Sequence, residues 1–163
     1  MTVLLETTGR VANPKSFDFE SLARLPGQVA DVAALIPGRK GGGVPLRTIL
    51  DETGPLGDVR YMTLQTADAS YSASIPLEAV ADQGLIVYRM GDEPVPEEEG
   101  GPVRFFIIDV ESCSLGAGEI DRCANVKFLH RIDFSAERGP DSRPATEEQH
   151  ERIHDESDPR PLA

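Results

Sequence analysis

Residues 150–154, His-Glu-Arg-Ile-His, have the spacing of a zinc-binding HExxH motif. On a helix this spacing places two imidazoles one turn apart, beside a glutamate that can act as a general base. Such a helix also needs an apolar face to hold it rigid and a third protein ligand. This segment lies in a polar stretch with only nine residues after it. We therefore interpret the match as a chance one and predict no metal site.

A second candidate is the glycine-rich segment 37–45, Pro-Gly-Arg-Lys-Gly-Gly-Gly-Val-Pro. Two cations, Arg39 and Lys40, precede three glycines, and Pro45 suits the first turn of a helix. Free backbone N–H groups at a helix N-terminus favour an anion, so Arg39, Lys40 and residues 41–43 are candidate ligands for a phosphate-bearing molecule. The segment is no Walker A loop, because no Lys-Ser/Thr pair follows the last glycine. A flexible surface turn remains the alternative interpretation. The glycines of this candidate site are Gly41, Gly42 and Gly43.

The chain has two cysteines, Cys113 and Cys123, and neither lies in a CxxC pair. Their spacing of ten matches no common zinc knuckle, and in a reducing compartment we expect free thiols. His130 lies in a strand-like run without a visible catalytic partner, and no GxSxG nucleophile elbow is present. The sequence therefore does not indicate a hydrolase.

Charge and hydropathy exclude several classes of partner. The 163 residues include 28 acidic and 16 basic side chains, a formal net charge of −12. This charge repels a phosphate backbone, and no basic stripe offsets it, so we expect neither nucleic-acid binding nor attachment to an anionic membrane.

No apolar run approaches the ~18 residues needed to cross a bilayer, and the N-terminus has no signal-peptide pattern. The sequence predicts a cytoplasmic protein.

Candidate elements alternate along residues 1–134. Asp18 can cap a helix over 19–24, a second helix should run from Pro45 to the Gly54–Pro55 stop, and a third should begin at Pro76. Apolar or alternating runs predict strands at 29–32, 60–66, 71–75, 85–90, 103–108 and 126–134. This pattern favours an α+β fold with a mixed, mainly antiparallel β-sheet and a few short helices.

The composition changes after Phe134. Residues 135–163 carry eight acids and four arginines, and little that is apolar. Such a segment cannot bury enough surface to fold by itself. We predict one domain over 1–134 and an acidic, flexible tail over 135–163.

Several phrases, taken in order, resemble the molybdopterin-binding domain of the sulfite oxidase-type oxidoreductases. They are GRVANP (9–14), FESLARLP (19–26), GVPLRTIL (43–50), TAD (66–68) with YSASIPL (71–77), GGPVR (100–104) and NVKFLHRI (125–132). The resemblance implies the same α+β fold and a molybdopterin cofactor. It also implies that Arg104 in GGPVR and Lys127 in NVK lie near the pterin or its phosphate.

The chain differs from this family at the position of the residue that binds molybdenum. The family's molybdenum-ligating cysteine follows a strand that resembles residues 29–32, and here the corresponding stretch, 33–38, reads Ala-Ala-Leu-Ile-Pro-Gly. Alanine and leucine offer no soft donor atom for molybdenum. Catalysis is therefore in question.

Two interpretations of function stay open. In one, the chain is a molybdopterin-dependent oxidoreductase domain that holds a pterin or another anionic, phosphate-bearing molecule. In the other, it is a cofactor-free, non-catalytic module that binds a ligand or a protein. Exposed strand edges would also suit a homodimer.

Overall fold

The computed structural model describes residues 2–68, 70–108 and 125–142. Helices are short and strands predominate, as the sequence predicts. In chain order the elements are β1 (Leu5–Gly9), β2 (Ser16–Phe17), α1 (Phe19–Ala23), η1 (Val32–Ala34), β3 (Gly42–Pro45), α2 (Leu46–Thr53), β4 (Tyr61–Thr66), β5 (Ser72–Pro76), α3 (Leu77–Val80), β6 (Gly84–Arg89), η2 (Glu97–Glu99), β7 (Arg104–Ile107) and β8 (Leu129–Ser135).

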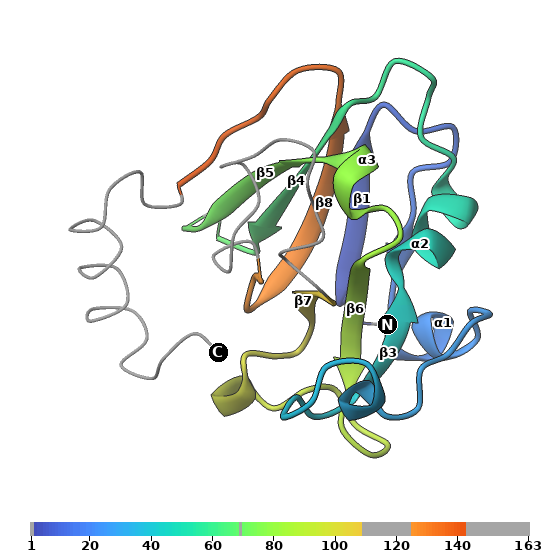
Figure 1. Cartoon of the computed structure of the whole chain (residues 1–163), viewed down its shortest axis with the longest axis vertical. Coiled ribbons are helices and arrows are strands. Elements are labelled where there is room, and N and C mark those ends of the chain that lie inside the picture. The colour runs from blue at the N-terminus through green and yellow to red at the C-terminus, as the bar shows by residue number, and fades with distance from the viewer. Residues whose placement is uncertain (1, 69, 109–124, 143–163) are drawn as a thin grey trace.

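The strands of the described residues form two sheets. One has five strands in the order β2-β1-β8-β4-β5, and the other has three in the order β3-β6-β7. Among these named strands, every pair is antiparallel except β1 with β8, which is parallel. Figure 1 shows α1 and α2 along one side of the molecule and β5 at the opposite edge. The α+β class with a mixed, mainly antiparallel sheet is confirmed.

Local sequence signals determine the helix ends. The Asp18 side chain accepts a hydrogen bond from the Ser21 N–H, and the Ser21 hydroxyl accepts from the Asp18 N–H, which completes a capping box at α1. α2 starts after Pro45 and ends at Gly54, whose φ of 62° is left-handed. α3 follows Pro76, as predicted. In these three cases the capping or terminating residue lies next to the helix, so the sequence suffices.

The prediction of a strand over 29–32 was wrong. Val29 makes a single bridge to Gly43, and Val32 begins the 3₁₀ helix η1. The Asp31 side chain accepts a hydrogen bond from the Ala33 N–H at 3.0 Å, which turns the chain out of the extended conformation.

The three-stranded sheet has apolar side chains on both of its faces. The main core lies on one face and includes Ile86, Tyr88, Phe105 and Ile107. A smaller cluster lies on the other face and consists of Val32, Leu85, Val87, Val95 and Phe106. Because successive side chains of a strand point to opposite faces, the run Arg104-Phe-Phe-Ile107 supplies both clusters. The smaller cluster is the floor of the candidate site.

None of the helices in the described part of the chain has the length and apolar character needed to cross a bilayer.

Candidate functional site

Strand β7 places a guanidinium group on an apolar floor. Arg104 and Phe106 are two positions apart, so they lie on the same face of the sheet, away from the main core. Arg104 is 8% exposed and Phe106 is 2% exposed. The Arg104 guanidinium carbon lies 4.5 Å from the centre of the Phe106 ring, within the range of a cation–π contact. A buried arginine of this kind is unusual unless other groups satisfy it.

A second guanidinium lies against the same ring. Arg39 follows η1 in the loop before β3, and its guanidinium carbon is 4.6 Å from the Phe106 ring centre. Arg39 and Arg104 are far apart in the sequence, so the fold brings together two of the cations that the sequence singled out. Sequence reasoning missed Phe106 itself. The alternation within β7, which puts Phe106 beside Arg104, is a signal that could have revealed it.

These groups surround a small cavity of about 90 Å³. We call it the cationic pocket and define it by Arg39, Lys40, Glu99, Arg104 and Phe106, all of which line it. The Arg104 Nη1 donates a hydrogen bond to the Glu99 carbonyl oxygen at 3.1 Å, which anchors the side chain to η2. The pocket therefore combines three cationic residues with Glu99 over an aromatic floor.

Lys127 does not line the cationic pocket, but its stem lies beside that of Arg104 at Gly100. A Cβ built on Gly100 would lie 2.9 Å from Arg104 Cδ and 3.0 Å from Lys127 Cγ, so both stems pass close over this residue. Gly100 also has a φ of 91°, which favours glycine. Its lack of a side chain lets Lys127 and Arg104 lie side by side.

A wider cleft of about 670 Å³ adjoins the cationic pocket through Lys40, which lines both. Gly41 and Gly42 line the wide cleft as well. So do Arg89 and Asp92, which form an ion pair at 3.0 Å.

The glycine-rich segment differs from its predicted form. Gly42 and Gly43 are not in a loop, because they begin β3, which pairs with β6 and separates the loop from α2. A Cβ on Gly43 would lie 2.2 Å from the Ile86 carbonyl oxygen, so this glycine serves close packing of two strands. Of the three glycines, Gly41 and Gly42 border a cleft and Gly43 is buried within the sheet.

His130 lies apart from these cations. It lines a third cleft of about 780 Å³ with Asp68 and the exposed ring of Phe128. Hydrogen bonds from the Ser70 N–H and from the Ser70 and Thr66 hydroxyls lower the pKa of Asp68. Within the described residues, no three histidine, cysteine or acidic side chains gather in a way that could hold a metal ion. Cys113, Cys123 and the segment 150–154 lie outside those residues.

Residues 33–142 match the family described as "Oxidoreductase molybdopterin binding domain". The chain belongs to this family. The match includes Arg39, Lys40, Arg104 and Lys127, and it confirms the resemblance that the sequence suggested. No curated protein matches the chain.

Among solved structures, the sulfane dehydrogenase SoxCD from Paracoccus pantotrophus is similar, with a TM-score of 0.58 and 22% identity. The similarity covers 83% of this chain and 39% of the SoxCD chain, so this chain spans well under half the length of that relative. At this identity the likeness concerns the fold.

The family's cofactor can be tested against the residues present. Arg39, Lys40 and Arg104 are suited to a phosphate, since guanidinium and ammonium groups are its usual protein partners. The stretch where the resemblance leads us to expect the family's cysteine does not fit the metal. Ala33 and Ala34 lie in η1, and their side chains carry no donor atom. The described residues thus fit the phosphate of the cofactor and offer no thiolate to its metal.

Proposed function

We propose that this chain is a binding domain for a phosphate-bearing ligand, the pterin cofactor of its family or a close analogue. The phosphate lies in the cationic pocket and the planar part of the ligand lies in the wide cleft. The observation that carries this proposal is the convergence of Arg39 and Arg104 on the Phe106 ring, with Lys40 lining the same small cavity.

The sizes of the two cavities support this division. A cavity of about 90 Å³ has room for a group the size of a phosphate, whereas whole cofactors occupy clefts of roughly 300–1,000 Å³. The wide cleft, at about 670 Å³, falls within that range. Lys40 lies between the two and can contact both parts of one ligand.

The electrostatics of the pocket also favour an anion. Arg104 is buried, and attraction between charges is stronger where water is excluded. The net charge of −12 slows the approach of an anion over long distances, so binding depends on these local cations. The backbone carbonyl oxygen of Glu99 accepts a hydrogen bond from Arg104 and holds its side chain in place.

The alternative is a cofactor-free module that keeps the fold and binds another ligand or a protein. The observation that favours it is the stretch 33–38, which supplies no sulfur donor. The cytoplasmic location and the lack of a nucleic-acid partner stay predictions.

The test is to purify the chain from a host that makes the cofactor, and to measure co-purified pterin by fluorescence after oxidation and molybdenum by elemental mass spectrometry. The variant is Arg39→Ala/Lys40→Ala. The matched control is Arg10→Ala/Lys15→Ala, which removes the same charge at two exposed ion pairs away from the pocket. Inorganic phosphate, titrated against each purified protein, reports the cationic pocket directly.

We expect pterin to co-purify with the native chain and with the control. The amount of co-purified pterin should fall at least tenfold with the pocket variant, since two charge-assisted contacts are removed. The affinity for inorganic phosphate should likewise be similar in the native chain and the control and lower in the pocket variant. This affinity should fall as salt is added. Equal pterin and phosphate binding by all three proteins would reject the pocket as the site. Absence of pterin from the native chain, with phosphate still bound, would favour the cofactor-free alternative.

A further inference from the structure

One end of the five-stranded sheet carries a cleft that the proposed function does not use. We call it the acidic cleft and define it by Asp68, Glu97, Phe128 and His130, which line a space of about 780 Å³. Small ligands usually bind in clefts of roughly 300–1,000 Å³. Two of the four side chains are carboxylates, and none of the described residues that line the cleft is a lysine or an arginine. The acidic cleft therefore has the opposite charge to the cationic pocket.

Strand pairing brings Asp68 and Phe128 to the same end of the sheet. In the antiparallel pair of β4 with β8, Thr66 lies opposite Leu129. Asp68 follows the last residue of β4 by two positions, and Phe128 comes directly before the first residue of β8. The arrowhead of β4 and the beginning of β8 therefore lie together, as Figure 1 shows. Glu97 reaches the cleft from η2.

The backbone holds Phe128 in a conformation that bulky residues seldom adopt. Its φ of 56° is the only positive value of a non-glycine residue in the described part of the chain. The Phe128 N–H donates to the Gly100 carbonyl oxygen at 2.7 Å, and the Leu129 N–H donates to the Val103 carbonyl oxygen at 2.8 Å. Phe128 nevertheless remains 43% exposed. The fold thus presents an aromatic ring at the cleft without burying it.

The Asp68 carboxylate is fixed in the same cleft. Its Oδ1 accepts hydrogen bonds from the Thr66 hydroxyl at 2.9 Å and from the Ser70 N–H at 3.0 Å. These contacts and the Ser70 hydroxyl lower the pKa of Asp68, so the group is charged at neutral pH. Among the residues that the structure describes, neither Asp68 nor Glu97 forms an ion pair. The cleft therefore holds negative charge that these residues do not neutralise.

Another part of the chain shows which group can contact a ring and a carboxylate at once. The Arg89 guanidinium carbon lies 5.6 Å from the centre of the Phe19 ring, and Arg89 pairs with Asp92 at 3.0 Å. A guanidinium group suits both contacts, because its plane stacks on aromatic rings while its N–H groups bond to carboxylate oxygens. No cation of the described residues lies over the Phe128 ring. The acidic cleft thus offers the same two contacts to a group from outside the described chain.

We propose that the acidic cleft binds a guanidinium group, which stacks on the Phe128 ring and bonds to the Asp68 carboxylate. Glu97 adds a second negative charge, and the net charge of −12 draws a cation toward the protein. The group belongs either to a small molecule or to an arginine side chain of another protein. None of the residues that define the cationic pocket lines this cleft, so the site does not depend on the proposed function.

The test follows the backbone amide chemical shifts of the full chain while ethylguanidinium is added at constant ionic strength. Ethylurea is the matched uncharged planar compound, and ethylammonium carries the charge without the planar group. A tripeptide with blocked ends, Gly-Arg-Gly, presents the same group as an arginine side chain. Together the four probes separate charge, planarity and the source of the guanidinium group.

Two variants remove the two proposed contacts. Asp68→Asn removes the charge and keeps an acceptor oxygen for Thr66 and Ser70. Phe128→Gly removes the ring and suits the positive φ. The matched control is Asp51→Asn, which removes the same charge from an exposed residue of α2 that does not line the cleft. Circular dichroism checks that each variant is folded.

We expect ethylguanidinium to shift the amides of residues 66–68 and 128–130 with millimolar affinity. Ethylurea and ethylammonium should bind at least about threefold more weakly, and each cleft variant should lose affinity for ethylguanidinium about threefold or more. Asp51→Asn should bind as the native chain does. Tighter binding of the tripeptide than of ethylguanidinium would assign the site to an arginine of another protein, and equal or weaker binding would assign it to a small molecule.

Three results would overturn the proposal. Ethylurea or ethylammonium could bind as tightly as ethylguanidinium, which would show that the charge or the plane is not recognised. The affinity could be unchanged in both Asp68→Asn and Phe128→Gly. The shifts could also lie away from residues 66–68 and 128–130, which would place the binding elsewhere on this acidic protein.

Discussion

Arg104 illustrates what single residues contribute to this molecule. Its position in β7 buries the guanidinium group, and its contacts with the Phe106 ring and the Glu99 carbonyl oxygen replace part of the hydration that it loses. Arg39 reaches the same ring from a loop. The chemistry of the pocket therefore depends on where each cation is placed, since the chain as a whole is strongly acidic.

Asp18 gives a prediction at this scale. Hydrogen bonds from Ser21 lower the pKa of Asp18 below its usual value of 3.8 in the folded chain. A lowered folded pKa means that the cap stabilises the fold above the unfolded pKa and that this contribution is lost as the pH falls through the folded value. We expect Asp18→Ala to lower the thermal midpoint at pH 7, and this effect should shrink as the pH falls below 3.8 and through the lower folded pKa. Thermal unfolding followed by circular dichroism from pH 2.5 to 7 measures it.

Asparagine at the same position is the control. It accepts the same hydrogen bond from the Ser21 N–H but does not titrate. Asp18→Asn should therefore stay closer to the native chain at pH 7 than Asp18→Ala does. An effect of Asp18→Ala that is the same at every pH would contradict the prediction.

At the scale of elements, the pairing of β3 with β6 decides how the glycine-rich segment is used. Val44 and Ile86 face the main core, and Gly43 lies directly over the Ile86 backbone. The strand holds the far end of the loop that carries Arg39 and Lys40. The pocket thus depends on a sheet contact that the loop sequence alone does not reveal.

Gly43→Ala tests this contact. The added Cβ would lie 2.2 Å from a backbone oxygen, which cannot move aside as a flexible side chain can. We expect the variant to lose about 1–3 kcal/mol of unfolding free energy or more, as overpacked sites do. Gly57→Ala is the control, because nothing lies within 4 Å of its Cβ, and it should be close to neutral. Urea unfolding of both measures the difference, and equal midpoints would refute the role given to Gly43.

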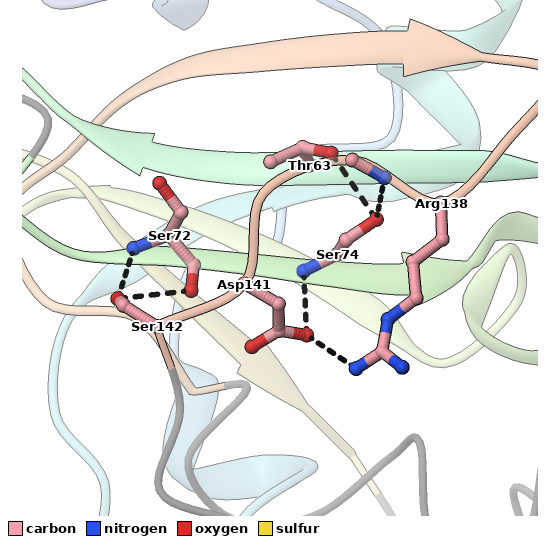
Figure 2. A network of polar contacts seen from close by, with 7 residues as sticks. Thr63, Ser72, Ser74, Arg138, Asp141 and Ser142 are labelled. Atoms are coloured by element: carbon pink, nitrogen blue, oxygen red, sulfur yellow. Dashed lines mark hydrogen bonds and ion pairs between the residues drawn. The ribbon is translucent and has the colours of Figure 1, made fainter.

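At the scale of the whole molecule, the limit of the folded domain is a separate question. The sequence places it at residue 134, and that boundary stays a prediction. Residues 139–142, however, make hydrogen bonds with β5 (Figure 2), and the family match also extends to residue 142. We therefore propose that the domain continues to Ser142 and that the acidic tail begins at 143.

Two truncations separate these boundaries. A chain that ends at Ser142 should have nearly the native thermal midpoint, since the residues removed are polar and acidic. A chain that ends at Ser135 also loses several hydrogen bonds of about 0.5–1.5 kcal/mol each, so its midpoint should fall by several degrees. Scanning calorimetry distinguishes the two. Equal midpoints for both truncations would place the boundary at 134 after all.

The sequence alone determined the class of fold, the helix ends and the family. Those features rest on local chemistry: the Asp18 cap, the Pro45 start and the Gly54 stop each act within a few residues. It also singled out Arg39, Lys40 and Arg104 before any geometry was known. The prediction of a strand over 29–32 was wrong. There the Asp31 side chain accepts a hydrogen bond from the Ala33 N–H, and the backbone enters a 3₁₀ turn in place of a strand.

Tertiary structure decided what these residues form together. Three features join segments distant in the sequence: the meeting of Arg39 with Arg104 on Phe106, the burial of Gly43 in β3, and the hydrogen bonds of residues 139–142 with β5. Such contacts depend on strand pairing and register, which bring distant residues together through backbone groups that every residue shares. The side-chain types of one segment therefore do not specify its partner.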